Sequence, residues 1–156
     1  MKQEIERKFL VTSESWRAAA GVGLPCRQGY ISAEVSEVTV RVRLMGGQGF
    51  LTLKGPTNGI SRPEMEYEIP ATEAEYMLEH FCSGGLVSKV RYILIHNGLR
   101  WEIDEFSGEN AGLIVAEIEL DNENQPFEKP EWLGKEVSLD RRYTNAALAR
   151  NPFREW

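Results

Sequence analysis

Charged and apolar side chains alternate within the first ten residues of this chain. Single residues separate Glu4, Glu6 and Lys8, so in a β-strand these three would share one face, while Ile5 and Phe9 take the other. Carboxylates bind hard divalent cations, and an ammonium group binds anions such as phosphate. On a single strand the same pattern is typical of a solvated sheet edge. Its meaning therefore depends on the rest of the chain.

The alternation of charged and apolar residues recurs in almost every predicted strand. The charged faces carry blocks of one sign and few neutral polar residues. Their basic members are Arg41, Arg43, Lys54, Arg62, Lys89 and Arg91, and their acidic members include Glu64, Glu66, Glu102, Asp104, Glu117 and Glu119. Like charges on one sheet face repel one another. The pattern therefore indicates a face that binds a compensating ligand.

The elements that would position these side chains are mostly strands. Hydrophobic alternation and turn residues predict strands at 3–11, 27–34, 36–45, 49–55, 61–69, 87–96, 99–106, 113–121 and 135–139. Gly46-Gly47 and Asn97-Gly98 predict hairpins, so consecutive strands should pair antiparallel.

Helices are expected at 13–20, 73–82 and 141–150. Thr72 and Glu75 have the spacing of a capping box for the second helix, and Asp140 is the expected N-cap of the third. The apolar stripes of these helices must pack on the apolar strand faces. If the sheet curls into a barrel, the helices lie outside and the charged faces line the lumen. Such a lumen would bind a polyanion and a divalent metal ion, as a phosphoryl-transfer site requires.

Size and composition narrow the class of protein. The chain has 156 residues, which predicts one domain over 1–156. Its net charge of −6 disfavours general nucleic-acid binding. Because no segment approaches the roughly 20 apolar residues of a membrane span and no signal peptide is evident, we expect a cytoplasmic protein without a membrane partner. Cys26 and Cys82 are expected to be reduced thiols. The sequence leaves a homodimer open.

The ordered set of motifs resembles the CYTH superfamily, also called triphosphate tunnel metalloenzymes. Its ExExK signature corresponds to residues 4–8, and the basic strands of the family are similar to 39–43, 51–54 and 89–92. Further similar segments lie at 28–30, 62–66, 101–104, 112–120 and 142–145. These segments span the chain in the expected order. Because the chain is short for the family, the resemblance is to the small single-domain bacterial members.

This resemblance implies an α+β fold, a predominantly antiparallel eight-stranded barrel with a charged lumen and helices packed outside. It implies a hydrolase that removes the terminal phosphate of inorganic triphosphate with Mg²⁺ or Mn²⁺ as cofactor. The substrate-binding residues that it implies are Lys8, Arg41, Arg43, Lys54, Arg62, Lys89 and Arg91. The metal ligands would be Glu4, Glu6, Glu117 and Glu119, and the catalytic residues Lys8, Glu64, Glu66 and Asp104.

Other functions stay open at the level of sequence. Relatives of this kind also hydrolyse thiamine triphosphate or a nucleoside triphosphate, or cyclise ATP. A third alternative is a non-catalytic module that binds polyphosphate or triphosphates. The many carboxylates disfavour this module, because binding a polyanion does not require them.

Overall fold

The computed structural model describes residues 1–31 and 37–156. Its strands are β1 (Lys2–Val11), β2 (Leu24–Ile31), β3 (Thr39–Met45), β4 (Gln48–Lys54), β5 (Ser61–Ile69), β6 (Ser83–His96), β7 (Leu99–Phe106), β8 (Ile114–Glu119) and β9 (Leu133–Glu136). The α-helices are α1 (Ala71–His80) and α2 (Asn145–Arg150). Short 3₁₀ turns are η1 (Ser15–Ala18), η2 (Gly108–Asn110), η3 (Arg141–Tyr143) and η4 (Phe153–Glu155).

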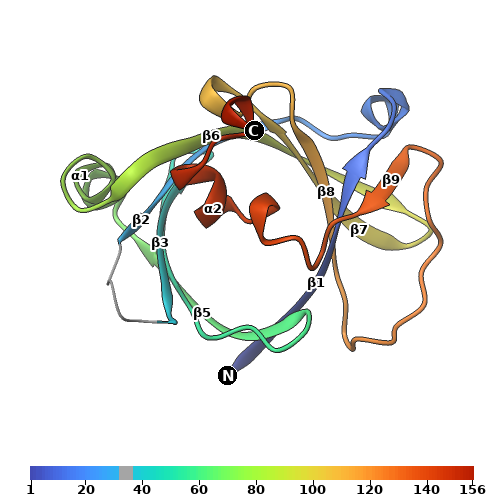
Figure 1. Cartoon of the computed structure of the whole chain (residues 1–156), viewed down its shortest axis with the longest axis horizontal. Coiled ribbons are helices and arrows are strands. Elements are labelled where there is room, and N and C mark those ends of the chain that lie inside the picture. The colour runs from blue at the N-terminus through green and yellow to red at the C-terminus, as the bar shows by residue number, and fades with distance from the viewer. Residues whose placement is uncertain (32–36) are drawn as a thin grey trace.

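The strands form a closed barrel (Figure 1). Their order is β5-β4-β3-β2-β6-β7-β8-β1, and pairing of β1 with β5 closes the ring. Every pair of neighbours is antiparallel. Two strands, β5 and β9, pair with the same edge of β1: its first residues pair with β5 and its last residues pair with β9. The expected α+β fold with an eight-stranded antiparallel barrel is confirmed.

Tight turns set the register of two hairpins. Gly46 and Gly47 join β3 to β4 with φ of 58° and 82°, and Asn97 and Gly98 join β6 to β7 with φ of 48° and 76°. Positive φ at both central residues matches the right-handed twist of the flanking strands, and glycine and asparagine tolerate it best. Because a two-residue turn fixes which residues face each other, it also fixes which side chains point into the barrel.

The outer face of β1, β7 and β8 carries a large apolar cluster. Phe9, Trp101 and Ile118 are at most 1 % exposed, and Trp16 from η1 and Trp132 from the segment before β9 cover them. These strand residues alternate with Lys8, Glu102 and Glu117. Burial of the apolar face outside the barrel therefore turns the charged face inward.

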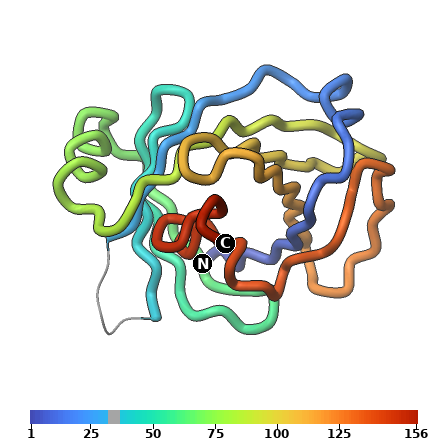
Figure 2. Tube along the Cα trace, turned by 45° about the horizontal axis from the view of Figure 1, so that its top comes forward, coloured from blue at the N-terminus to red at the C-terminus, as the bar shows by residue number. Residues whose placement is uncertain are grey.

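Helix α1 lies outside the closed sheet, as expected, whereas α2 packs against strand residues on the cavity-facing side (Figure 1). Helix α1 packs Ala74 and Leu78 against Val42 of β3. Helix α2 packs Leu148 and Ala149 into a cluster with Val87 and Phe106, which share strand faces with Lys89 and Asp104. The C-terminal segment therefore covers one opening of the barrel (Figure 2).

Several element boundaries differ from the prediction. The helix expected at 13–20 is only the η1 turn, and the one expected at 141–150 is divided between η3 and α2. Strand β6 begins at Ser83, four residues before the expected start at 87. Residues 32–34 and 36 of two predicted strands lie outside the described residues.

The capping box predicted at Thr72 is wrong. Helix α1 begins at Ala71 with Pro70 as N-cap, and the Pro70 carbonyl accepts hydrogen bonds from the amides of Glu73 and Ala74 at 3.0 Å each. Strand β5 runs directly into this proline, so the preceding strand fixes where the helix begins. In contrast, the side chain of Asp140 accepts from the Arg142 amide, and it caps η3 as predicted.

Cys26 and Cys82 are both free thiols. In the described part of the chain, no helix has the length and apolar character needed to span a membrane.

Candidate functional site

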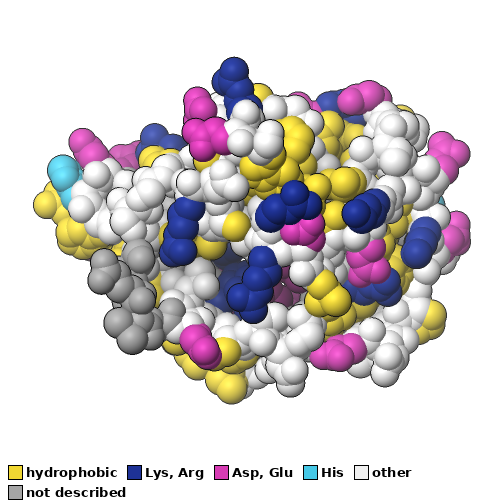
Figure 3. All heavy atoms as spheres, viewed as in Figure 1, with side chains coloured by type: hydrophobic (Ala, Val, Ile, Leu, Met, Phe, Trp, Pro, Cys, Tyr) yellow, Lys and Arg dark blue, Asp and Glu magenta, His cyan; other side chains and the backbone are white. Residues whose placement is uncertain are grey.

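A cavity of about 1350 Å³ lies inside the barrel, and residues from all eight barrel strands line it. The space-filling view shows this hollow with basic and acidic side chains at its mouth and inside it (Figure 3). The predicted site residues that line the cavity are Glu4, Glu6, Lys8, Arg41, Arg43, Lys54, Arg62, Glu64, Glu66, Lys89, Arg91, Glu117 and Glu119. Asp104 is absent from this lining.

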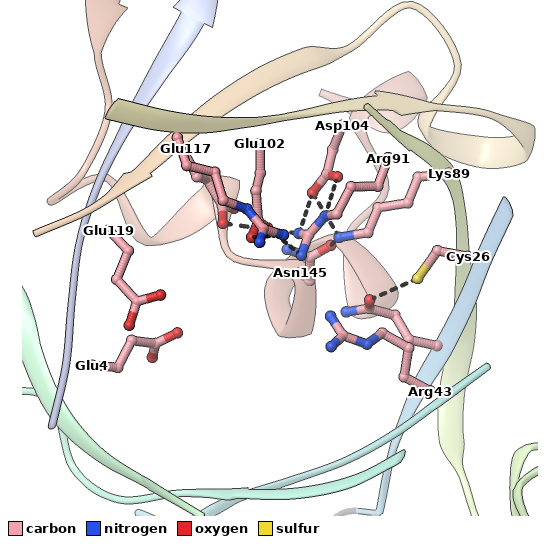
Figure 4. A network of polar contacts seen from close by, with 12 residues as sticks. Glu4, Cys26, Arg43, Lys89, Arg91, Glu102, Asp104, Glu117, Glu119 and Asn145 are labelled. Atoms are coloured by element: carbon pink, nitrogen blue, oxygen red, sulfur yellow. Dashed lines mark hydrogen bonds and ion pairs between the residues drawn. The ribbon is translucent and has the colours of Figure 1, made fainter. Parts of the chain in front are cut away.

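Asp104 lies behind two basic residues instead. Its carboxylate accepts from Lys89 Nζ at 2.7 Å and from Nε and Nη2 of Arg91 at 2.8 Å each (Figure 4). Burial acts to raise the pKa of Asp104, but Arg91 and Lys89 outweigh it and hold that pKa well below its usual range. Because the Asp104 side chain is 1 % exposed, it orients the two cations from the wall of the barrel.

A second basic group lies on β3. Arg41 and Arg43 reach the Glu66 carboxylate at 3.2 and 3.4 Å, and the hydroxyl of Thr52 donates to the same carboxylate at 2.8 Å. The Nε atoms of both arginines are buried without a hydrogen-bond partner in the described structure. Burial and the neighbouring Arg41 and Arg91 lower the pKa of Arg43. An anion in the cavity would bind the guanidinium groups and relieve this repulsion.

Glu4 joins the basic and acidic parts of the cavity. Its carboxylate accepts from Lys54 Nζ at 2.7 Å and from Arg62 Nε at 3.0 Å. Burial acts to raise the pKa of Glu4, but Lys54 and Arg62 outweigh it and lower the pKa to about 2. Glu4 is therefore ionised at neutral pH.

The remaining carboxylates crowd together where β1 pairs with β8. Glu6 lies opposite Glu119 in the strand register, and Lys8 lies opposite Glu117. Burial, followed by the charges of Glu117 and Glu4, raises the pKa of Glu6 to about 8. The crowding raises the free energy of the ionised form, and a nearby cation would lower it.

These carboxylates suit a hard divalent cation, which prefers oxygen ligands. Glu4 and Glu119 project from β1 and β8 into the same part of the cavity (Figure 4). Among the residues that the structure describes, no three acidic, histidine or cysteine side chains are already grouped around one point. Glu4 is paired with Lys54, and Glu119 with Lys2 at 3.1 Å. The residues fit a metal ion once these carboxylates turn away from their lysines.

Lys8 stands between the acidic and basic regions. Its ammonium lies 3.4 Å from Glu117 Oε1 and donates to the Tyr143 carbonyl at 3.2 Å. Burial acts to lower the pKa of Lys8, but Glu117, Glu6 and Asp104 outweigh it and raise that pKa. Lys8 is thus a fully charged donor within the cavity.

Three further polar residues belong to the site but were not among the predicted ones. Lys2 shares a strand face with Glu4, so its spacing could have identified it. Thr52 lies between Arg41 and Glu66. Asn145 receives a hydrogen bond from Lys89 at 3.1 Å, and only the tertiary structure brings this residue to the cavity.

Similarity to known proteins extends over almost the whole chain. A family model described as the CYTH domain matches residues 2–147. An inorganic triphosphatase of Acetivibrio thermocellus is 47 % identical over 156 residues, which is 100 % of this chain and 99 % of that protein. One from Nitrosomonas europaea is 40 % identical over 149 residues, 94 % of this chain and 96 % of that protein. The crystal structure of the inorganic triphosphatase NE1496 matches with a TM-score of 0.66 and 36 % identity, over 93 % of this chain and 96 % of that chain.

Proposed function

Because this chain belongs to the CYTH domain family, we propose that it is a hydrolase that cleaves inorganic triphosphate to pyrophosphate and orthophosphate. The two inorganic triphosphatases to which it is similar span nearly its whole length, so the proposal extends over one complete barrel.

One observation carries this proposal. Arg41 and Arg43 line the cavity, and the buried Nε atoms of both side chains have no hydrogen-bond partner in the described structure. Lys89 and Arg91 lie on the neighbouring wall, so positive charge surrounds the same space. Guanidinium groups bind phosphate oxygens with directional, often bidentate hydrogen bonds. A linear anion with several phosphate groups can engage both walls at once.

In this proposal the basic residues bind different parts of the triphosphate. Arg41, Arg43, Lys89 and Arg91 bind phosphate oxygens, and Lys54 and Arg62 extend the basic surface towards Glu4. Lys8 neutralises the negative charge that develops as the bond to the terminal phosphate breaks. Its ammonium is suited to this role because Glu117 and the Tyr143 carbonyl fix its position.

The carboxylates take two kinds of role in this proposal. Glu4, Glu6, Glu117 and Glu119 would hold the divalent ion, Mg²⁺ or Mn²⁺, which supplies Lewis-acid stabilisation of the phosphate charge. Glu64 and Glu66 line the cavity and orient the attacking water. Asp104 does not line it, so we assign Asp104 to positioning Lys89 and Arg91 and not to contact with the reacting atoms.

A phosphate-release assay tests this function. Purified protein is offered tripolyphosphate, pyrophosphate, ATP or thiamine triphosphate, each with Mg²⁺, with Mn²⁺ or with a chelator. We expect release from tripolyphosphate with either metal and loss of release with the chelator. Preference for an organic triphosphate, cyclic AMP as product, or binding without turnover would each contradict the proposal.

A further inference from the structure

The C-terminal segment places one neutral polar side chain against the basic wall of the cavity. Asn145 is the first residue of α2 and lines the cavity. Its backbone is well anchored, because the Thr144 hydroxyl accepts from the Ala147 amide at 3.1 Å and Leu148 packs in the core at 1 % exposure. The position of Asn145 is therefore set by the fold and does not depend on a ligand.

The orientation of its carboxamide follows from chemistry. Lys89 Nζ lies 3.1 Å from Asn145 Oδ1. An ammonium group has donors only, so the carboxamide must present its oxygen to Lys89 and turn its Nδ2 group elsewhere. Lys89 cannot move easily, because its side chain is 1 % exposed and Asp104 holds it at 2.7 Å. The ion pair thus fixes the orientation of Asn145 as well.

The Nδ2 group of Asn145 makes no hydrogen bond to any other residue in the described ranges. Asn145 is half-buried and lies below Arg91 and Lys89, on the side of the open cavity (Figure 4). Its two N–H donors therefore remain available next to the cations that the proposed function assigns to phosphate binding.

We propose that Asn145 is a substrate-contacting residue whose Nδ2 donates a hydrogen bond to a phosphate oxygen of bound triphosphate. This inference rests on the proposed function. Lys89 and Asn145 act together, because one oxygen of the amide holds the lysine while its nitrogen binds the anion. A neutral donor here adds a directional contact without adding further positive charge beside Lys89 and Arg91.

The same segment touches a second basic residue, since the Tyr143 carbonyl accepts from Lys8 Nζ at 3.2 Å. Residues 143–145 therefore contact both Lys8 and Lys89, on two different strands. This arrangement explains why a segment far from the charged strands in sequence belongs to the substrate site.

Three variants separate the roles of the amide. Asn145→Asp keeps the shape and an acceptor for Lys89 but removes both N–H donors. Asn145→Ala removes donor and acceptor. Thr144→Asp is the matched control for charge, because aspartate also caps helices and adds the same negative charge one residue away. The readouts are KM and kcat for tripolyphosphate, with circular dichroism and thermal unfolding to verify the fold.

We expect Asn145→Ala and Asn145→Asp each to raise KM about 10- to 100-fold, as the loss of a hydrogen bond to a charged group predicts. A smaller change in kcat and a smaller effect of Thr144→Asp are also expected. Wild-type KM in Asn145→Asp would show that Asn145 serves only as an acceptor for Lys89. An equal loss in Thr144→Asp would attribute the effect of Asn145→Asp to charge, because Thr144 also lines the cavity. Wild-type KM in Asn145→Ala, which adds no charge, would then refute the contact.

Calorimetric titration with tripolyphosphate in the presence of chelator distinguishes this inference from the proposed function. If the wild-type protein binds tripolyphosphate but does not hydrolyse it, the proposed function fails and the variants still test the contact. If the wild-type protein hydrolyses tripolyphosphate and the variants match it in affinity and KM, the contact at Asn145 is refuted.

Discussion

Replacing Asp104 by asparagine would expose how strongly the basic wall depends on one buried carboxylate. Asp104 makes three short contacts, at 2.7, 2.8 and 2.8 Å, to two buried cations. Removing one partner of a buried ion pair costs about 3–5 kcal/mol, because the remaining charge is left uncompensated. For a protein of this size each kcal/mol lowers Tm by about 2–4 °C, so we expect Tm to fall by about 6–20 °C.

Tripolyphosphate should restore part of that loss. In Asp104→Asn, Lys89 loses the carboxylate that pairs with it, and Arg91 keeps only Glu102 and the more distant Glu117. A bound polyanion should therefore stabilise the variant more than it stabilises the wild-type protein. The assay is thermal unfolding with increasing tripolyphosphate in the presence of chelator, which prevents metal-dependent turnover. Glu109→Gln is the control, because Glu109 is exposed on η2 and its neutralisation should change stability by less than about 0.5 kcal/mol.

Two results would refute this reasoning. The first is an unchanged Tm in Asp104→Asn, which would mean that water or other groups compensate the two cations. The second is a ligand-induced rise in Tm equal to that of the wild-type protein, which would mean that the phosphate groups do not bind near Lys89 and Arg91.

The remaining predictions concern the reaction, the metal and acid stability. Lys8→Ala, Arg43→Ala and Glu119→Ala should each lower kcat/KM for tripolyphosphate by about 100-fold or more while circular dichroism stays unchanged. Lys129→Ala, at an exposed residue, is the control. Full activity in any of the three variants would exclude that residue from the site. Dialysis against a chelator should abolish phosphate release, and Mg²⁺ or Mn²⁺ should restore it; turnover that persists without metal would contradict the roles of the four glutamates. Because the pKa of Glu4 falls on folding from its ordinary 4.5 to about 2, its contribution to stability is present above about pH 4.5 and is lost as the pH falls towards 2. Between pH 7 and pH 3 the free energy of unfolding, measured with denaturant, should therefore fall less in Glu4→Gln than in the wild-type protein. An equal fall in both proteins would refute the lowered pKa of Glu4.

Local signals predicted the turns and the strand faces well. The two-residue turns at Gly46-Gly47 and Asn97-Gly98 have the positive φ that their residues favour. Helix starts were predicted less reliably. Thr72 and Glu75 satisfy the capping-box spacing, yet α1 begins at Ala71, since Pro70 follows β5 directly and provides the N-terminal carbonyl. The position of Pro70 directly after β5 thus outweighs the N-cap preference of Thr72, which is worth about 1 kcal/mol.

The sequence by itself determined which side chains share a face, because alternation along a strand has a period of two and needs no partner strand. That is why Glu4, Glu6 and Lys8 were predicted together, and why thirteen of the fourteen predicted site residues line one cavity. Only the tertiary structure decided that Asp104 lies behind Lys89 and Arg91, because depth in the wall depends on which neighbours fill the space. It also decided that Asn145 reaches Lys89 across 56 residues of sequence. Contacts of that kind arise from chain closure and packing, which spacing along one strand does not encode.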